Sequence, residues 1–193
     1  PSRITAMAVD DRLGSGESSI FIGTADGQVL VYDLDGNLRW EYLIEELAEG
    51  VNEVLAFNQS SDDEEVLLVA GQQSILRLSR SEQEIRSTSF AIFDSPVEAL
   101  FPVQQPGSQE LSVALTVFTQ DGSVHGLNRR GIEMSLWAWP FELNVNGDPG
   151  VIQPSGQGAV EAFQENVTAF LVASESGELQ HVTITDNQPA VSW

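Results

Sequence analysis

A turn signal that recurs between short apolar runs is the feature that most limits how this chain can fold. In residues 19–42, SIFIGTADGQVLVYDLDGNLRWEY, three runs rich in β-branched and aromatic residues are separated by Asp26-Gly27 and by Asp35-Gly36. Asp-Gly favours tight hairpin turns because glycine adopts the positive φ that these turns require. The segment therefore predicts three consecutive antiparallel strands.

The same order of strand, polar loop, strand, turn, strand, turn and strand recurs along the chain. Its four copies span residues 4–44, 51–90, 97–142 and 159–193. Copies of roughly 40–50 residues with four strands each are typical of β-propeller blades. Residues 143–158, rich in Pro, Gly and Asn, are predicted to form an insertion loop between the last two copies.

The pattern predicts an all-β fold, a β-propeller of about four four-stranded antiparallel blades in one domain over 1–193. A β-sandwich or an up-and-down barrel is the alternative. The blades form either a small closed ring or part of a larger propeller. Pro1 replaces an initiator methionine, and the end of the chain supplies no strand to complete the first copy, which favours the partial propeller.

The charge is strongly negative, with 29 acidic residues against eight basic ones and a net charge of -21. Nucleic acids and anionic membrane surfaces bind basic patches, so neither is expected as a partner. No apolar run approaches the roughly 18 residues of a membrane span, and no signal-peptide pattern is present. The acidic surface either serves solubility, as in a salty habitat, or attracts a basic protein partner or cations. The compartment stays open because the chain has no cysteine.

The run AVDDRLGSGESSIFIGTADGQVLVYDLDGNLRWEY resembles a repeat of the FG-GAP and quinoprotein-like (PQQ-repeat) propellers, and is WD-repeat-like in its blade pattern. The segment 137–141, WAWPF, is similar to the Gly-Trp-Pro segment of such repeats. In the FG-GAP pattern, alternating carboxylates in the loop before the second strand bind calcium. The matching positions are Asp11, Leu13 and Ser15. Only Asp11 of these three carries a carboxylate, whereas calcium needs several oxygen ligands, so Asp11 is the single candidate metal ligand. No other cofactor is expected.

Aromatic residues before the insertion are the candidate partner-binding residues. Trp137, Trp139 and Phe141 alternate, so they share one face of a predicted strand, which is either core or an exposed aromatic anchor. Asn146 and Asp148 in the insertion loop complete this set, because long loops on rigid scaffolds often carry function.

Catalytic chemistry has little support in the sequence. His125 and His181 are offset by one residue relative to their turns, so they are expected on opposite faces, and no nucleophile-elbow pattern is present. The favoured function is a non-catalytic scaffold or assembly subunit that binds protein partners, including a basic partner or copies of itself that complete the propeller. The alternatives are a quinoprotein-like or glycan-active enzyme and a calcium-dependent extracellular adhesion or sensing module.

Overall fold

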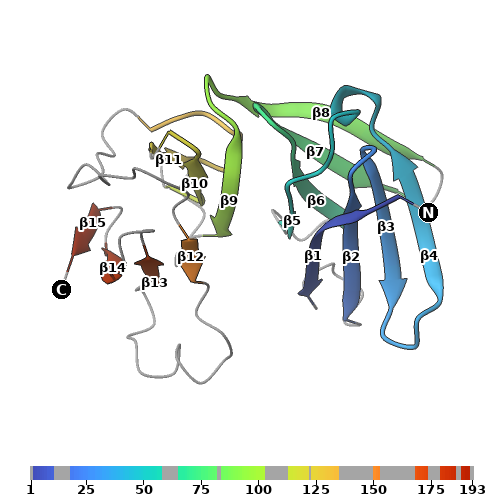
Figure 1. The fold of residues 1–193 in the computed structure, drawn as a ribbon, viewed down its shortest axis with the longest axis horizontal. Helices are drawn as coiled ribbons and strands as arrows, with labels where there is room; N and C mark the ends of the chain where they lie inside the picture. Colours follow the sequence, from blue (N-terminus) through green and yellow to red (C-terminus); the bar gives the residue numbers. More distant parts are fainter. Residues whose placement is uncertain are drawn as a thin grey trace. The chain divides into compact units, whose positions relative to one another are not determined.

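A computed structural model provides the fold of the chain (Figure 1). It describes residues 2–10, 18–57, 65–81, 84–102, 113–121, 123–134, 150–152, 168–173, 179–185 and 188–191. These residues form antiparallel sheets, which confirms the all-β prediction. The chain divides into two compact units, Pro1–Leu100 and Phe101–Trp193, which are described separately.

Unit 1 contains two four-stranded sheets in which strands follow chain order (Figure 1). Sheet 1 consists of β1 (Ile4–Asp10), β2 (Ser19–Thr24), β3 (Gln28–Asp33) and β4 (Leu38–Leu43). Sheet 2 consists of β5 (Glu53–Ala56), β6 (Glu65–Ala70), β7 (Ser74–Arg80) and β8 (Ile85–Ile92). A short 3₁₀ helix, η1 (Glu45–Leu47), lies in the connection between the sheets. Both sheets are the meanders that the first two sequence copies predict.

The turn between β2 and β3 is closed by a threonine–aspartate pair. The Thr24 hydroxyl donates to the Asp26 carboxylate at 2.6 Å and accepts from the Gln28 backbone N–H at 2.9 Å. Gly27 has φ of 82°, as its predicted place in the turn requires. The Asp-Gly signal thus acts together with a buried threonine that precedes it by two residues.

The same arrangement recurs in unit 2, where the Thr119 hydroxyl donates to Asp121 at 2.8 Å. The Asp121 carboxylate accepts from the Ser123 backbone N–H at 3.1 Å. Copies one and three of the sequence therefore share a turn chemistry as well as a strand pattern.

Thr24→Val is expected to lower the free energy of unfolding by about 1–3 kcal/mol, because the partly buried Gln28 N–H then loses its partner. Thr88→Val is the matched control, since the Thr88 side chain is exposed and only weakly bonded to the Arg77 carbonyl, at 3.5 Å. Urea titrations of the parent and both variants measure the difference. Equal losses in the two variants would contradict the role assigned to Thr24.

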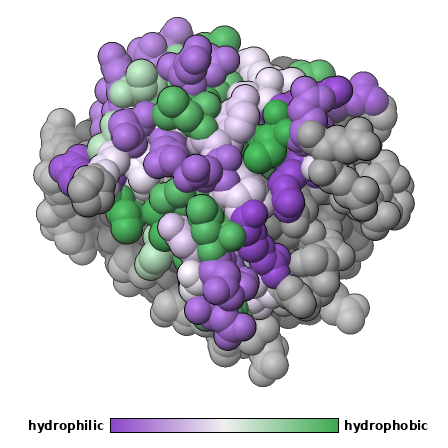
Figure 2. Space-filling view, turned by 90° about the vertical axis from the view of Figure 1, so that its right-hand side faces the viewer, coloured by the Kyte–Doolittle hydropathy of each residue, from purple (hydrophilic) through white to green (hydrophobic). Residues whose placement is uncertain are grey.

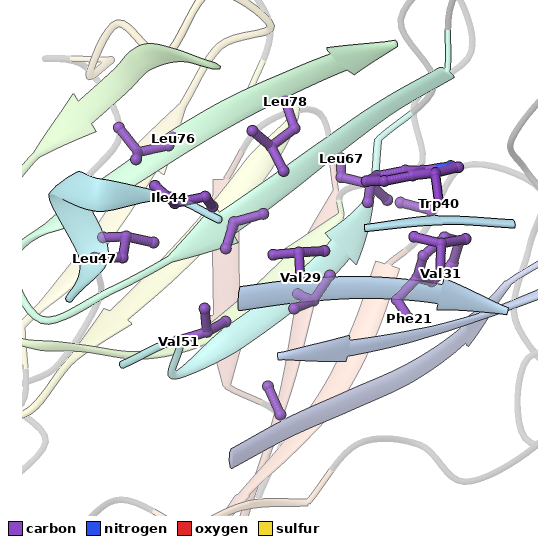
Figure 3. Close-up of a cluster of buried hydrophobic side chains, with 14 residues drawn as sticks. Phe21, Val29, Val31, Trp40, Ile44, Leu47, Val51, Leu67, Leu76 and Leu78 are labelled. Atoms are coloured by element: carbon purple, nitrogen blue, oxygen red, sulfur yellow. The ribbon is translucent and has the colours of Figure 1, made fainter. Parts of the chain in front are cut away.

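The core of unit 1 lies between the facing sides of sheets 1 and 2 (Figure 3). Successive side chains of a strand alternate between the two sides of its sheet. In sheet 1, Phe21, Val29 and Val31 therefore point to the same side, and all three are fully buried. They pack against apolar residues of sheet 2 such as Leu67 and Leu78. Burial of this interface is what holds the two sheets together.

Unit 2 contains the later strands of the chain. One sheet has three strands in the order β11-β10-β9. They are β9 (Val97–Pro102), β10 (Leu115–Thr119) and β11 (Val124–Leu127), and β9 begins at the end of unit 1. Within it, the rings of Phe101 and Phe118 meet edge to face with centroids 5.6 Å apart. The other sheet consists of β12 (Gly150–Ile152), β13 (Thr168–Ala173), β14 (Leu179–Thr185) and β15 (Gln188–Val191).

Unit 2 differs from the sequence prediction at one strand. The sequence predicts an insertion loop over 143–158 and a leading strand at 159–163, whereas β12 lies at Gly150–Ile152 and pairs with β13. The run is only three residues long and follows Asp148-Pro149, so its composition reads as a loop, and pairing with β13 decides its conformation. Residues 159–163 and 135–142 lie outside the described residues, and so does the last predicted strand of copy three.

Candidate functional site

The residues that the sequence analysis selects lie in the parts of the chain that the structure does not describe. This applies to the metal candidate Asp11 and to the five partner-binding candidates. They are Trp137, Trp139, Phe141, Asn146 and Asp148. Their roles stay predictions, and a site must be sought among the described residues.

A histidine–glutamate pair in unit 2 was not selected as a site by the sequence analysis. His125 on β11 lies 2.8 Å from Glu133, measured from Nδ1 to Oε1, and the Glu133 side chain is largely exposed. A short bridge between Leu127 and Glu133 places this carboxylate beside the strand. Among the described residues, no group of three or more metal-ligating side chains occurs. The pair is a surface ion pair when the histidine is protonated.

An acidic rim surrounds the connection between sheets 1 and 2. It consists of four exposed carboxylate residues, Asp26, Glu45, Glu46 and Glu49. Backbone hydrogen bonds hold the two segments that carry them, since the Ile44 N–H donates to the Gly27 carbonyl at 3.0 Å. The Val51 N–H likewise donates to the Thr24 carbonyl at 3.0 Å. The rim is therefore a negative surface on ordered backbone.

Two carboxyl groups in this region have shifted pKa values in opposite directions. Hydrogen bonds from Thr24 and then Ser2 hold the pKa of Asp26 below its ordinary value. Desolvation raises the pKa of Glu53, at the start of β5, to about 7. Asp26 thus keeps its charge down to low pH, whereas Glu53 changes charge near neutrality.

The shifted pKa of Glu53 predicts that acidification stabilises this part of the fold. Glu53 titrates at about 4.5 in the unfolded chain and at about 7 in the folded one, so the folded state binds more protons between these values. The stabilisation is complete below pH 4.5 and is lost as the pH rises through 7. Glu53→Gln should remove a difference of about 2–3 kcal/mol between pH 5 and pH 8.

Denaturant titrations at both pH values measure this difference. Glu49→Gln is the control, because Glu49 is an exposed carboxylate of the neighbouring connection. Subtracting the control removes the general effect of the net charge. An unchanged pH dependence in Glu53→Gln would show that Glu53 is ionised at little cost in the fold.

A second surface is the distal face of sheet 1, the side that points away from sheet 2. By strand alternation and pairing register, it carries side chains from all four strands. Its partly buried members are Ile20, Ile22, Leu30 and Tyr32. Its exposed apolar members are Ile4, Met7, Val9, Leu38 and Leu43. A sheet face that contacts water usually carries polar side chains. An apolar face of this extent therefore indicates an interaction surface.

The distal face has a signal in the sequence that was not used. In IFI (20–22) and VLVY (29–32), apolar residues occupy both parities of the strand. Such continuous runs are typical of strands that are buried on both faces. Figure 2 views the side of the molecule that carries β4 in Figure 1, and hydrophobic patches there lie among hydrophilic ones.

Comparison of the structure with solved structures finds similar chains, among them two from one complex. The first is BBS1N in a crystal structure with ARL6DN, soaked with lead, at a TM-score of 0.61 and 17% identity. The second, from the same complex soaked with mercury, has a TM-score of 0.54 and 17% identity. The matches cover 99% and 98% of this chain but 52% and 54% of those chains, so this chain spans about half of their length. No protein-family model and no curated protein matches the sequence.

This likeness shows the fold and confirms the β-propeller prediction. At 17% identity it does not extend to function, because one fold hosts many functions. A specific relationship to the FG-GAP or PQQ-repeat propellers is not established by it. In the described residues, none of the helical structure has the length and hydrophobicity of a membrane span.

Proposed function

We propose that this chain is a non-catalytic β-propeller module that binds a protein partner, and that a basic surface of the partner contacts the acidic rim. The observation that carries the proposal is the rim itself. Its side chains Glu45, Glu46 and Glu49 are exposed on a connection that backbone hydrogen bonds hold in place. Complementary charge steers association and selects partners, and a net charge of -21 disfavours acidic ones.

The similar structures support the proposal by analogy. BBS1N is found there in a complex with another protein, ARL6DN. That complex is a property of BBS1N, and it supports a binding role for this chain by similarity of fold. The fold presents rigid sheets with loops at their ends, which suits recognition of a protein surface.

A charge-neutralised rim tests the proposal. The rim variant combines Glu45→Gln, Glu46→Gln and Glu49→Gln. The control variant removes three exposed carboxylates outside the rim, Asp35→Asn, Glu84→Gln and Asp94→Asn. Each immobilised protein is exposed to an extract of the source cells, and bound proteins are quantified by mass spectrometry. We expect basic proteins that the parent and control retain and the rim variant loses.

The affinity of one such purified partner then decides the mechanism. Loss of three exposed ion pairs is expected to weaken binding about tenfold, and high salt should reduce the difference. Equal retention of the same proteins by the rim and control variants would contradict the proposal.

A further inference from the structure

The distal face of sheet 1 has the same arrangement as the face of sheet 2 that packs on sheet 1. In sheet 2, strand pairing places Val54, Val69 and Leu76 in one row, and Ala56, Leu67 and Leu78 in the next. These six residues belong to the core between the two sheets. They are at most 6% exposed.

In sheet 1, pairing places Met7, Ile22 and Leu30 in one row of the distal face. Val9, Ile20 and Tyr32 make the next row. The two sheets thus match position by position over three strands, with apolar residues at each position. The exposure differs, since Met7 is 66% and Val9 60% exposed whereas their counterparts Val54 and Ala56 are buried.

Sheet 2 is a blade that has buried apolar residues on both of its faces. Its opposite face carries Leu68, Ala70 and Ile75, and these are also fully buried. Sheet 1 has one buried face and one exposed apolar face. The exposed face therefore carries apolar side chains of the kind that pack between blades.

We propose that the distal face of sheet 1 packs against a further propeller blade, which is not one of the four sheets of this chain. The partner blade presents a face of the kind that sheet 1 presents to sheet 2, where Phe21, Val29 and Val31 point outward. This deepens the proposed function, since it rests on the propeller scaffold and names a second partner surface.

Three observations identify the occupant. On β4, Leu38 and Leu43 extend the apolar surface on either side of Glu41, which pairs with Leu30. The contact therefore spans four strands and fits a whole sheet rather than one added strand. The first similar solved chain continues well beyond the 52% that this chain matches, so there is further polypeptide next to the matched part of that chain. A second copy of this chain is disfavoured because each copy brings a net charge of -21.

Oxidation of Met7 by hydrogen peroxide reports whether the face is covered, because susceptibility of methionine follows its exposure. The only other methionine is Met134, which gives an internal reference. In the 193-residue chain we expect a monomer by light scattering and rapid oxidation of Met7. A protected Met7 in a monomer would mean that the chain covers this face itself, and a protected Met7 in a dimer would mean that a second copy does. Either result overturns the proposal.

A duplicated blade supplies the proposed occupant. Residues 4–50, with Met7→Leu in the added copy, are fused directly before Ile4 of the chain, so that η1 and Gly50 connect the added blade to β1 as they connect sheet 1 to β5. We expect oxidation of the original Met7 to slow at least about tenfold. In the control fusion, the added copy also carries Phe21→Asn and Val31→Asn, and Met7 should oxidise as in the parent.

An unchanged rate of Met7 oxidation in the fusion would overturn the proposal. Amides of the added copy that are unprotected in hydrogen exchange would also overturn it, because the same sequence folds as a blade where it packs beside sheet 2. Val9→Glu in the parent is an independent check, since a side chain in water should leave the thermal midpoint unchanged. A fall of several degrees would show that the face is already covered. None of these readouts involves the acidic rim, so failure here and failure of partner binding are distinguishable.

Discussion

Phe21→Ala is expected to lower the free energy of unfolding of unit 1 by about 3–5 kcal/mol, the range for removing a buried aromatic side chain. Phe21 is fully buried in the core between sheets 1 and 2, where it lies beside Val31 (Figure 3). Phe21 lies on β2, which pairs with β1 on one side and with β3 on the other. The backbone therefore has little freedom to close the cavity that loss of the ring would leave. The remaining side chains therefore lose contacts that they cannot replace.

Guanidinium chloride titrations followed by circular dichroism measure this loss. Leu34→Ala is the control, because Leu34 is 63% exposed in the turn between β3 and β4 and should change the free energy by less than about 0.5 kcal/mol. A loss in Phe21→Ala no larger than in the control would mean that the two sheets do not share this core.

Gly27→Ala is expected to cost about 2–5 kcal/mol and Gly36→Ala about 1–2 kcal/mol, although the two glycines have nearly the same φ, 82° and 84°. The shared part is the left-handed backbone, which a Cβ disfavours. The difference comes from the surroundings. A Cβ at Gly27 would lie 2.5 Å from the Leu47 carbonyl oxygen, whereas one at Gly36 would meet nothing within 4 Å.

Comparison of the two variants therefore separates the cost of the close contact between the turn and η1 from the cost of backbone strain. Thermal and denaturant unfolding of both variants give the two free-energy changes. Equal costs would show that the turn around Gly27 moves away from η1 without penalty. A smaller cost for Gly27→Ala than for Gly36→Ala would contradict the contact outright.

Sheets 1 and 2 were predictable because their signals are local. Asp26-Gly27 and Asp35-Gly36 fix the turns, and apolar runs of matching length lie on either side of them. In the second copy, Gln72 and Gln73 replace the Asp-Gly pair, yet β6 and β7 still pair, because the register follows from buried residues such as Leu67 and Leu78.

The parts that sequence reasoning missed depend on tertiary context. β12 is too short for a periodic pattern, and its pairing with β13 bridges a long stretch of chain. The desolvation of Glu53 depends on what packs over the start of β5, which no local pattern reveals. The distal face is different, because its apolar residues were visible and only their exposure required the structure.

The order of strands within each sheet has a consequence for synthesis of the chain. Strands β1 to β4 pair only with their neighbours in sequence, so sheet 1 can form while β5 is still inside the ribosome. Until sheet 2 emerges, however, the side of sheet 1 that carries Phe21, Val29 and Val31 has no cover. During this interval the nascent chain exposes the apolar side of sheet 1 that later packs on sheet 2, and this is when a chaperone would protect it from aggregation.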